Sequence, residues 1–268
     1  INRLLIYLKE NKIATVIVLH DLWFLTGHCF YPCMTGCSKY EVMCGCCNQK
    51  NMANRSFLFD TSKKIWKDRK KIFDHWEKLA IVGVSKWAAD CAQKAAVIRN
   101  NKNICYIYNW IDSEKFYPFE IEFSENKETF TILGVSSSWS LEKGLNDFAK
   151  LSYMLEEDEK LIMVGRMRKT DKAKFNSAVV TFIEFTNSEQ ELSELYNKAD
   201  VFVSMSTQET FGKTIAEAVC CGTPAVTYDQ TASPEIVSDG CGYAVNMGNV
   251  EAIYEKVKLI RSNGKAYY

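Results

Sequence analysis

The sequence predicts an α/β protein made of two doubly wound, parallel-sheet domains, the first of them partial. Two observations lead to this prediction. Short apolar runs, such as residues 130–135, 199–204 and 225–228, alternate with helical stretches, which is typical of strands buried between helices. The chain of 268 residues is also long enough for two domains, and its 47% hydrophobic content can supply a core for each.

Composition and charge exclude several classes of protein. Lysine and arginine together number 33, as do aspartate and glutamate, so no basic field indicates a nucleic-acid partner. No apolar run is long enough to cross a membrane, and no signal-peptide pattern opens the chain, so we expect a cytoplasmic protein. Ile1 is not an initiator methionine, and a helix over residues 1–10 should follow earlier strands. We therefore expect a fragment of a longer protein.

The first half alternates helices and strands, and we expect helix 1–10, buried strand 13–19, helix 63–79, strand 79–84, helix 86–98 and strand 104–108. His20 stands at the carboxyl end of the first strand, where open α/β sheets bind ligands. A histidine in this place can also simply cap a neighbouring carbonyl. We place the domain boundary after residue 112, which gives domains 1–112 and 113–268.

A cysteine-rich loop over residues 28–50 holds six of the 11 cysteines. Four of them, including a C-x-x-C pair, could hold a structural zinc ion as thiolates: Cys29, Cys37, Cys44 and Cys47. Two alternatives stay open. The cysteines can form disulfides, which a reducing compartment disfavours, or they can be small buried thiols.

The helix over residues 63–79 is basic on the side that its apolar residues leave free. Its lysines and Arg69 surround a set of apolar residues at helical spacing. One interpretation is a weak, peripheral contact with a membrane surface, at the inner face of the membrane. The other is a helix that packs on the core and turns a solvated basic face outward.

The second half alternates more regularly, and we expect strand 130–135, a helix that opens at Glu142, strands 161–165 and 179–185, helix 189–198, strand 199–204, a short helix that contains Glu217 and ends at Gly222, strand 225–228, a helix that Ser233 caps before Pro234, a turn at Gly240 and Gly242, and helix 250–260. This order of elements predicts an open parallel sheet with helices on both faces.

Residues 206–224 contain the side chains and backbone groups that we expect to bind a ligand. Glu209 falls in a loop at the carboxyl end of a strand, and Glu217 falls in the helix that follows. At the start of this helix, unpaired backbone N–H groups can attract a phosphate or sugar oxygen, those of Phe211, Gly212, Lys213 and Thr214. Two carboxylates would repel a phosphate, but they accept hydrogen bonds from hydroxyls. Phosphate plus hydroxyls describes a sugar nucleotide, although an ordinary helix with one solvated and one capping glutamate would show the same pair.

Several segments resemble known patterns of one enzyme family. Glu209 and Glu217 around Phe-Gly, followed by Glu-Ala-x-x-x-Gly-Thr-Pro, resemble the signature of family 4 glycosyltransferases of the GT-B fold. Lys143-Gly144 resembles the Lys-Gly element of the family, and residues 109–118 resemble its interdomain segment. The run from Trp23 to Cys29, with the cysteines after it, resembles the sequence of one branch of this family. That branch is linked to bacterial exopolysaccharide (colanic-acid-type) synthesis. The resemblance implies a GT-B protein truncated at both ends.

The resemblance also implies a reaction and roles for residues. The reaction is transfer of a sugar, with retention, from a UDP- or GDP-sugar to a hydroxyl of a glycan or lipid-linked acceptor. Glu217 would hold the ribose, Lys143 the diphosphate, and Glu209 with the amides of residues 211–213 the transferred sugar, while His20 would complete the far wall. Such chemistry requires no divalent metal.

The sequence departs from the family at one position. Most members carry an arginine a few residues before the lysine, where this chain has serines. We expect Ser137 and Ser138 to take over part of its work at the diphosphate, or Arg166 or Arg168 to reach in from the next loop. A non-catalytic module that binds a sugar nucleotide, or a metal or partner through the cysteine loop, remains the alternative to an enzyme.

Overall fold

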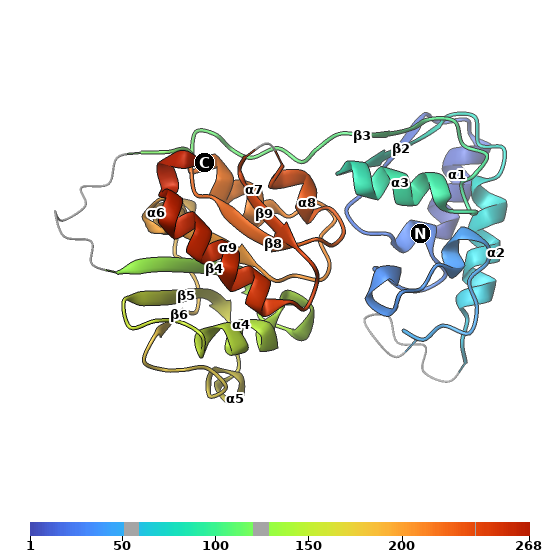
Figure 1. The fold of residues 1–268 in the computed structure, drawn as a ribbon. Coiled ribbons are helices and arrows are strands. Elements are labelled where there is room, and N and C mark those ends of the chain that lie inside the picture. Colours follow the sequence, from blue (N-terminus) through green and yellow to red (C-terminus); the bar gives the residue numbers. More distant parts are fainter. Residues whose placement is uncertain (51–58, 120–128, 239) are drawn as a thin grey trace. The chain divides into compact units, whose positions relative to one another are not determined.

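A computed structural model describes residues 1–50, 59–119, 129–238 and 240–268. The chain forms two compact units, Ile1–Asn109 and Trp110–Tyr268, and each is described by itself (Figure 1). The break follows Asn109, whereas the predicted boundary follows residue 112. In the described parts of both units, no helix combines the length and the apolar character needed to cross a membrane.

The first unit is a three-stranded parallel sheet, in the order β1-β2-β3, with helices packed on it. Its elements are α1 (Asn2–Glu10), β1 (Thr15–Leu19), α2 (Ser62–Phe73), β2 (Leu79–Gly83), α3 (Lys86–Lys94) and β3 (Ile104–Tyr106), with 3-10 turns at Trp23–Leu25, Pro32–Thr35 and Lys39–Glu41. The predicted order of elements is correct, but four predicted elements are too long by two or more residues: the strands at β1 and β3 and the helices at α2 and α3.

Strand β1 is buried on one side only, which corrects the prediction of a buried strand. Ile17 and Leu19 lie in the core, but Val16 and Val18 are 63% and 47% exposed. Alternate side chains of a strand point to opposite faces of the sheet, and among the described residues only the face that carries Ile17 and Leu19 is covered. An apolar run therefore predicted the strand but not how many of its faces are covered.

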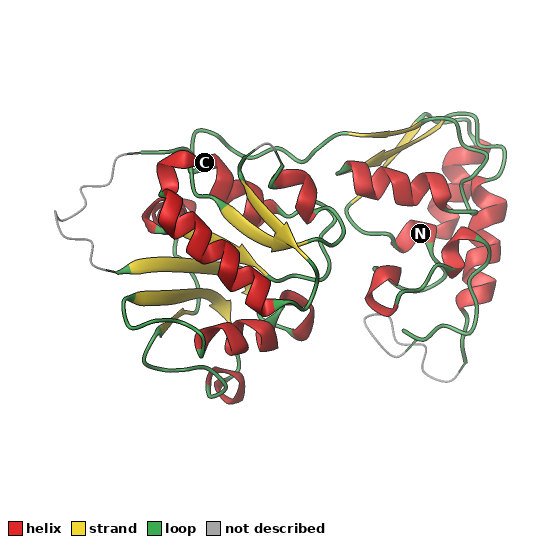
Figure 2. Cartoon of the chain, viewed as in Figure 1, coloured by secondary structure: helices red, strands yellow, loops and turns green. Residues whose placement is uncertain are grey.

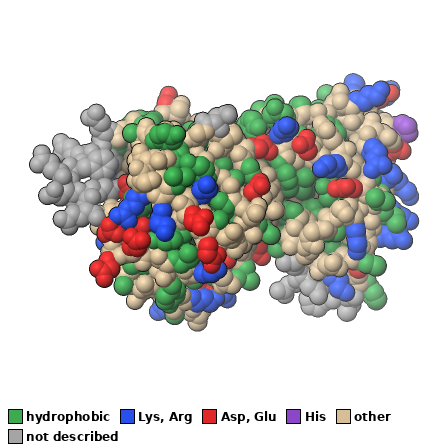
Figure 3. Space-filling model, in the orientation of Figure 1, with side chains coloured by type: hydrophobic (Ala, Val, Ile, Leu, Met, Phe, Trp, Pro, Cys, Tyr) green, Lys and Arg blue, Asp and Glu red, His purple; other side chains and the backbone are tan. Residues whose placement is uncertain are grey.

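Arg69 on α2 is buried, so it does not belong to the solvated basic face that we predicted. Its guanidinium lies 3.7 Å from the ring centre of Trp23 and donates hydrogen bonds to the carbonyls of Trp23 and Thr26. Burial lowers the pKa of Arg69 to about 10. The lysines of α2 are exposed as predicted, and basic side chains line the edge of the first unit where α2 lies (Figure 3).

The second unit is a six-stranded parallel sheet in the order β6-β5-β4-β7-β8-β9 (Figure 2). Its elements are β4 (Phe130–Ser138), α4 (Leu145–Ser152), β5 (Glu159–Arg166), α5 (Lys169–Lys172), β6 (Val180–Ile183), α6 (Glu189–Lys198), β7 (Val201–Ser204), α7 (Lys213–Cys220), β8 (Ala225–Tyr228), α8 (Ser233–Ile236), β9 (Gly242–Val245) and α9 (Val250–Asn263), with 3-10 turns at Leu141–Lys143 and Lys265–Tyr267. Apolar residues of α4 and α9 form a core cluster on one face of this sheet, and those of α6 and α7 form another.

The strand order places a functional position at the centre of this sheet. From β4 the chain moves outward through β5 and β6, and it then returns to pair β7 with the other edge of β4. Loops that follow β4 and β7 therefore diverge from neighbouring strands. Open α/β sheets bind their ligands at such a switch point, outside the carboxyl ends of the strands.

Three predictions in the second unit are corrected. The helix predicted to open at Glu142 begins at Leu145, after a 3-10 turn and the left-handed Gly144, whose φ is 76°. A Cβ at Gly144 would lie 2.5 Å from the carbonyl oxygen of Met205, so only glycine lets these two loops approach so closely. Ser233 is the first residue of α8 and makes no capping bond, and Gly242 begins strand β9 instead of a turn.

Candidate functional site

A pocket of about 200 Å³ lies at the switch point of the second unit. It is formed by the end of β4, the 3-10 turn after it, the end of β7 and the start of α7. Its polar lining consists of Ser136, Ser137, Ser204, Ser206, Lys143, Glu209, Lys213 and Thr214. The structure thus brings together five of the predicted site residues, from three separate segments of the chain.

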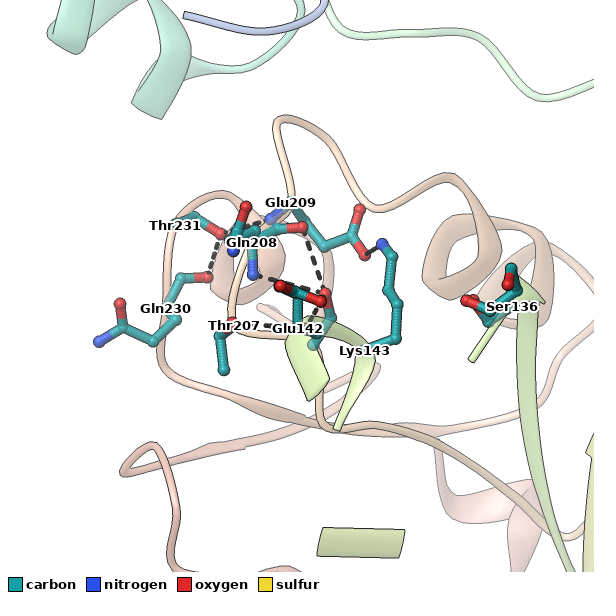
Figure 4. A network of polar contacts seen from close by, with 10 residues as sticks. Ser136, Glu142, Lys143, Thr207, Gln208, Glu209, Gln230 and Thr231 are labelled. Carbon is teal, nitrogen blue, oxygen red and sulfur yellow. Dashed lines mark hydrogen bonds and ion pairs between the residues drawn. The ribbon is translucent and has the colours of Figure 1, made fainter. Parts of the chain in front are cut away.

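Lys143 and Glu209 form an ion pair in this pocket (Figure 4). Lys143 Nζ lies 2.5 Å from Glu209 Oε1, and the two side chains are 38% and 17% exposed. The loops that carry them are also joined through their backbones, because the N–H of Thr207 donates to the carbonyl of Glu142 at 2.9 Å. A cation and a carboxylate are therefore held at the mouth of one pocket, where the cation can face a diphosphate.

The N-terminus of α7 opens toward the same pocket. Gly212 precedes the helix with a φ of 96°, a left-handed conformation that favours glycine. The first N–H groups of a helix have no partner within it, and its dipole places partial positive charge there. Together with Lys143 and Lys213, this end of α7 makes the pocket suitable for an anion.

Glu217 is buried one turn further into α7. Its Oε2 accepts a hydrogen bond from the hydroxyl of Tyr196 at 3.0 Å, and Lys213 Nζ lies 3.5 Å from its Oε1. Burial raises the pKa of Glu217 above its ordinary value, while Tyr196 and Lys213 partly offset this effect. The carboxylate is thus oriented by a fixed donor and keeps an oxygen that can accept further bonds.

Tyr196 was not predicted as a site residue. It is fully buried on α6 and packs edge-on against Phe116 and Phe202. A signal was present in the sequence, because a tyrosine on the apolar face of a helix needs a partner for its hydroxyl. That partner lies on another helix, which periodicity does not reveal.

The serines before Lys143 and the two arginines after it are divided between two cavities. Ser137 lines the pocket of Lys143, but Ser138 lines a neighbouring cavity of about 620 Å³ together with Arg166 and Arg168. Arg168 Nε is bound to Asp171 at 2.6 Å. In this structure, neither arginine lines the pocket of Lys143, and the anticipated approach of one of them stays a prediction.

The remaining predicted residues lie in the first unit. His20 is exposed directly after β1, at the carboxyl end of that strand. All 11 cysteines are free, and Cys44 Sγ accepts a hydrogen bond from the N–H of Gly27 at 3.2 Å. Burial raises the pKa of Cys29, and the nearby thiols of Cys37, Cys44 and Cys47 raise it further. The four cysteines lie in one loop, yet the described residues include no group of three or more His, Cys, Asp or Glu placed to hold a metal ion. The zinc site stays a prediction.

Comparison with known proteins gives one family for the second unit. The family described as "Glycosyl transferases group 1" matches residues 117–267. N-acetyl-alpha-D-glucosaminyl L-malate synthase of Bacillus anthracis is 24% identical over 186 residues, which are 62% of this chain and 46% of that protein. The N,N'-diacetylbacillosaminyl-diphospho-undecaprenol alpha-1,3-N-acetylgalactosaminyltransferase of Campylobacter jejuni is 26% identical over 63% of this chain and 47% of that protein. The chain thus spans about half the length of these relatives.

Solved structures agree with this match. Sucrose-phosphate synthase of Thermosynechococcus elongatus superimposes with a TM-score of 0.65 at 16% identity, covering 94% of this chain and 59% of that one. Anabaena HepE in complex with UDP-glucose superimposes with a TM-score of 0.57 at 18% identity, covering 74% and 58%. These likenesses confirm the predicted GT-B fold.

Proposed function

The chain belongs to the glycosyl transferases group 1 family, and on that premise we propose that it moves a sugar from a nucleotide-diphosphate sugar, a UDP- or GDP-sugar, to an acceptor hydroxyl. The observation that carries the proposal is the pocket at the switch point, in which Lys143, Glu209 and the N-terminus of α7 meet. Lys143 would hold the diphosphate, Glu209 with the amides at the start of α7 the transferred sugar, and the buried Glu217 the ribose hydroxyls.

The reaction we propose retains the configuration at the anomeric carbon. As the glycosidic bond breaks, the departing diphosphate gains negative charge, and it can take the proton of the acceptor hydroxyl on the same face of the sugar. The chain then contributes position and positive charge, from Lys143 and the α7 amides, so the donor site requires no divalent cation. The role of His20 at the transferred sugar stays a prediction from the family resemblance.

The acceptor we propose is a glycan or a lipid-linked sugar of a bacterial surface polysaccharide, used in the cytoplasm at the inner face of the membrane. A relative whose name includes an undecaprenol-linked acceptor supports this choice. The exposed lysines of α2 fit a weak peripheral contact with an anionic membrane.

Calorimetric titration of the chain with UDP, GDP and ADP tests the donor site. We expect one of the three nucleotides to bind. When the chain is given a sugar nucleotide of the same base without acceptor, we expect slow release of the nucleoside diphosphate. Omission of Mg²⁺ and Mn²⁺ should leave both measurements unchanged. Binding without any release would favour a non-catalytic module, and binding of none of the three nucleotides would contradict the proposal.

We also propose that Cys29, Cys37, Cys44 and Cys47 hold a structural zinc ion, because they are free thiols carried by one loop that contains a C-x-x-C pair. Chain purified without chelator should contain about one zinc ion per molecule by atomic emission. Replacing Cys44 and Cys47 with serine should abolish it, whereas replacing Cys220 and Cys241 should not. If the native chain contains no metal and is equally stable with and without added zinc, the site is refuted.

A further inference from the structure

Thr231 lies in a backbone conformation that threonine normally avoids. Its φ is 55°, in the left-handed region, where a β-branched side chain crowds the backbone. Within the described residues, the other non-glycine positions with positive φ are Lys12, Cys46 and His75, and none of these is β-branched. Such a conformation persists only where its surroundings hold it, so the presence of threonine here requires a reason.

The hydroxyl of Thr231 holds the backbone of Glu209 (Figure 4). Its Oγ1 accepts a hydrogen bond from the N–H of Glu209 at 2.9 Å and donates one to the carbonyl of Gln230 at 2.7 Å. The next residue, Ala232, donates its N–H to the carbonyl of Glu209 at 3.1 Å. Both backbone polar groups of Glu209 are therefore bound to the loop that follows β8.

Glu209 needs this support because its own segment has no regular structure. Residues 205–212 form neither helix nor strand between β7 and α7. The Glu209 side chain is held by Lys143, but a bound diphosphate would compete for that ammonium. Once Lys143 turns to the diphosphate, the bonds from residues 231 and 232 still hold the backbone of Glu209 directly.

We propose that Thr231 is a positioning residue, whose hydroxyl sets the place of Glu209 against the donor sugar and whose left-handed backbone brings the hydroxyl there. The role in transfer rests on the proposed function, whereas the tether to Glu209 does not. Threonine is then retained despite its strain, since glycine would relieve the conformation but remove the hydroxyl.

Three variants separate the hydroxyl from the strain. Thr231→Ser keeps the hydroxyl, Thr231→Ala removes it and keeps a Cβ, and Thr231→Gly removes both. We expect Thr231→Gly to unfold at a higher temperature than Thr231→Ala, because glycine adopts positive φ without a steric penalty. Both should release nucleoside diphosphate from the sugar nucleotide about 10- to 100-fold more slowly than the native chain, since the sugar-facing carboxylate is misplaced.

Two readouts distinguish positioning from general damage. Affinity for the nucleoside diphosphate should stay near the native value in both variants, and Thr231→Ser should restore the release rate. Amide hydrogen exchange across residues 205–212 should be faster in Thr231→Gly and Thr231→Ala than in the native chain and in Thr231→Ser. Lys12→Gly, which relieves a left-handed residue in the first unit, should change neither the exchange nor the release.

A native release rate in Thr231→Gly, or unchanged exchange across residues 205–212, would overturn the proposal. If the native chain releases no nucleotide from UDP-, GDP- or ADP-sugars, the proposed function fails, and exchange alone then decides the tether. Faster exchange in Thr231→Gly would still support it, and unchanged exchange would refute it.

Discussion

Replacing Lys143 with alanine should slow sugar transfer by about 10²- to 10³-fold. The leaving diphosphate gains negative charge as the glycosidic bond breaks, and Lys143 supplies an ammonium in the pocket proposed to hold it. Because this attraction grows toward the transition state, the rate should fall more than the affinity for the nucleoside diphosphate. Single-turnover release of nucleotide, set against calorimetric affinity, measures the two effects separately.

Lys150→Ala is a matched control for this loss of charge. Lys150 lies on α4 and pairs with the exposed Glu251 at 2.7 Å, so its removal should leave transfer and binding unchanged. If Lys150→Ala and Lys143→Ala slowed transfer equally, the effect would be one of net charge. If Lys143→Ala kept the native rate, the lysine would have no role in the reaction.

Glu209→Gln should separate the two members of the ion pair. Without ligand, the carboxylate of Glu209 neutralises Lys143, and the diphosphate must compete with it. The neutral amide of glutamine frees the lysine, so nucleoside diphosphate should bind at least as tightly as to the native chain, while transfer slows because the carboxylate that faces the sugar is gone. A weaker affinity in Glu209→Gln would show that this carboxylate does not compete for Lys143.

Replacing Glu217 with glutamine should weaken nucleotide binding by about 10- to 100-fold, because hydrogen bonds to a carboxylate contribute about 1.5–3 kcal/mol. Glutamine keeps the volume of the side chain and an acceptor for the hydroxyl of Tyr196. A 2′,3′-dideoxynucleotide should bind the native chain and Glu217→Gln equally, since it lacks the hydroxyls that the carboxylate accepts. If Glu217→Gln weakened the binding of both nucleotides equally, Glu217 would not bind the ribose hydroxyls.

The pKa of Glu217 gives this prediction a dependence on pH. Burial raises the pKa in the folded chain, so the carboxylate becomes protonated at a higher pH than an exposed glutamate. Native discrimination between ribose and dideoxyribose should therefore fall as pH is lowered through the raised pKa, and Glu217→Gln should show no such change. Since the raised pKa means that the ionised form is less favourable in the folded than in the unfolded state, glutamine should not lower the unfolding temperature at pH 7.

Much of the second unit could be predicted from its sequence, because its strands and helices are locally encoded. The helix at α6 and the strand at β8 have the predicted bounds, since each is a continuous pattern with a clear start, the capping Ser188 before α6 and Pro224 before β8. Glu209, Glu217 and Lys143 were predicted as a group because their spacing and neighbours resemble a known family. The same reasoning failed where burial depends on a distant partner, as for Arg69 and Val16 in the first unit.

By itself, the sequence determined the α/β class and the order of the elements, and it predicted the candidate residues of the donor site, since these follow from short-range periodicity and from motifs. Only the tertiary structure decided which groups bind and orient these candidate residues. Lys143 meets Glu209 across 66 positions, Tyr196 meets Glu217 across 21, and Thr231 meets Glu209 across 22. Periodicity predicts whether a side chain is buried. Hydrogen bonds between distant residues depend instead on how neighbouring strands position the segments that follow them. Those positions were set by the strand order β4-β7-β8, which no local pattern contains.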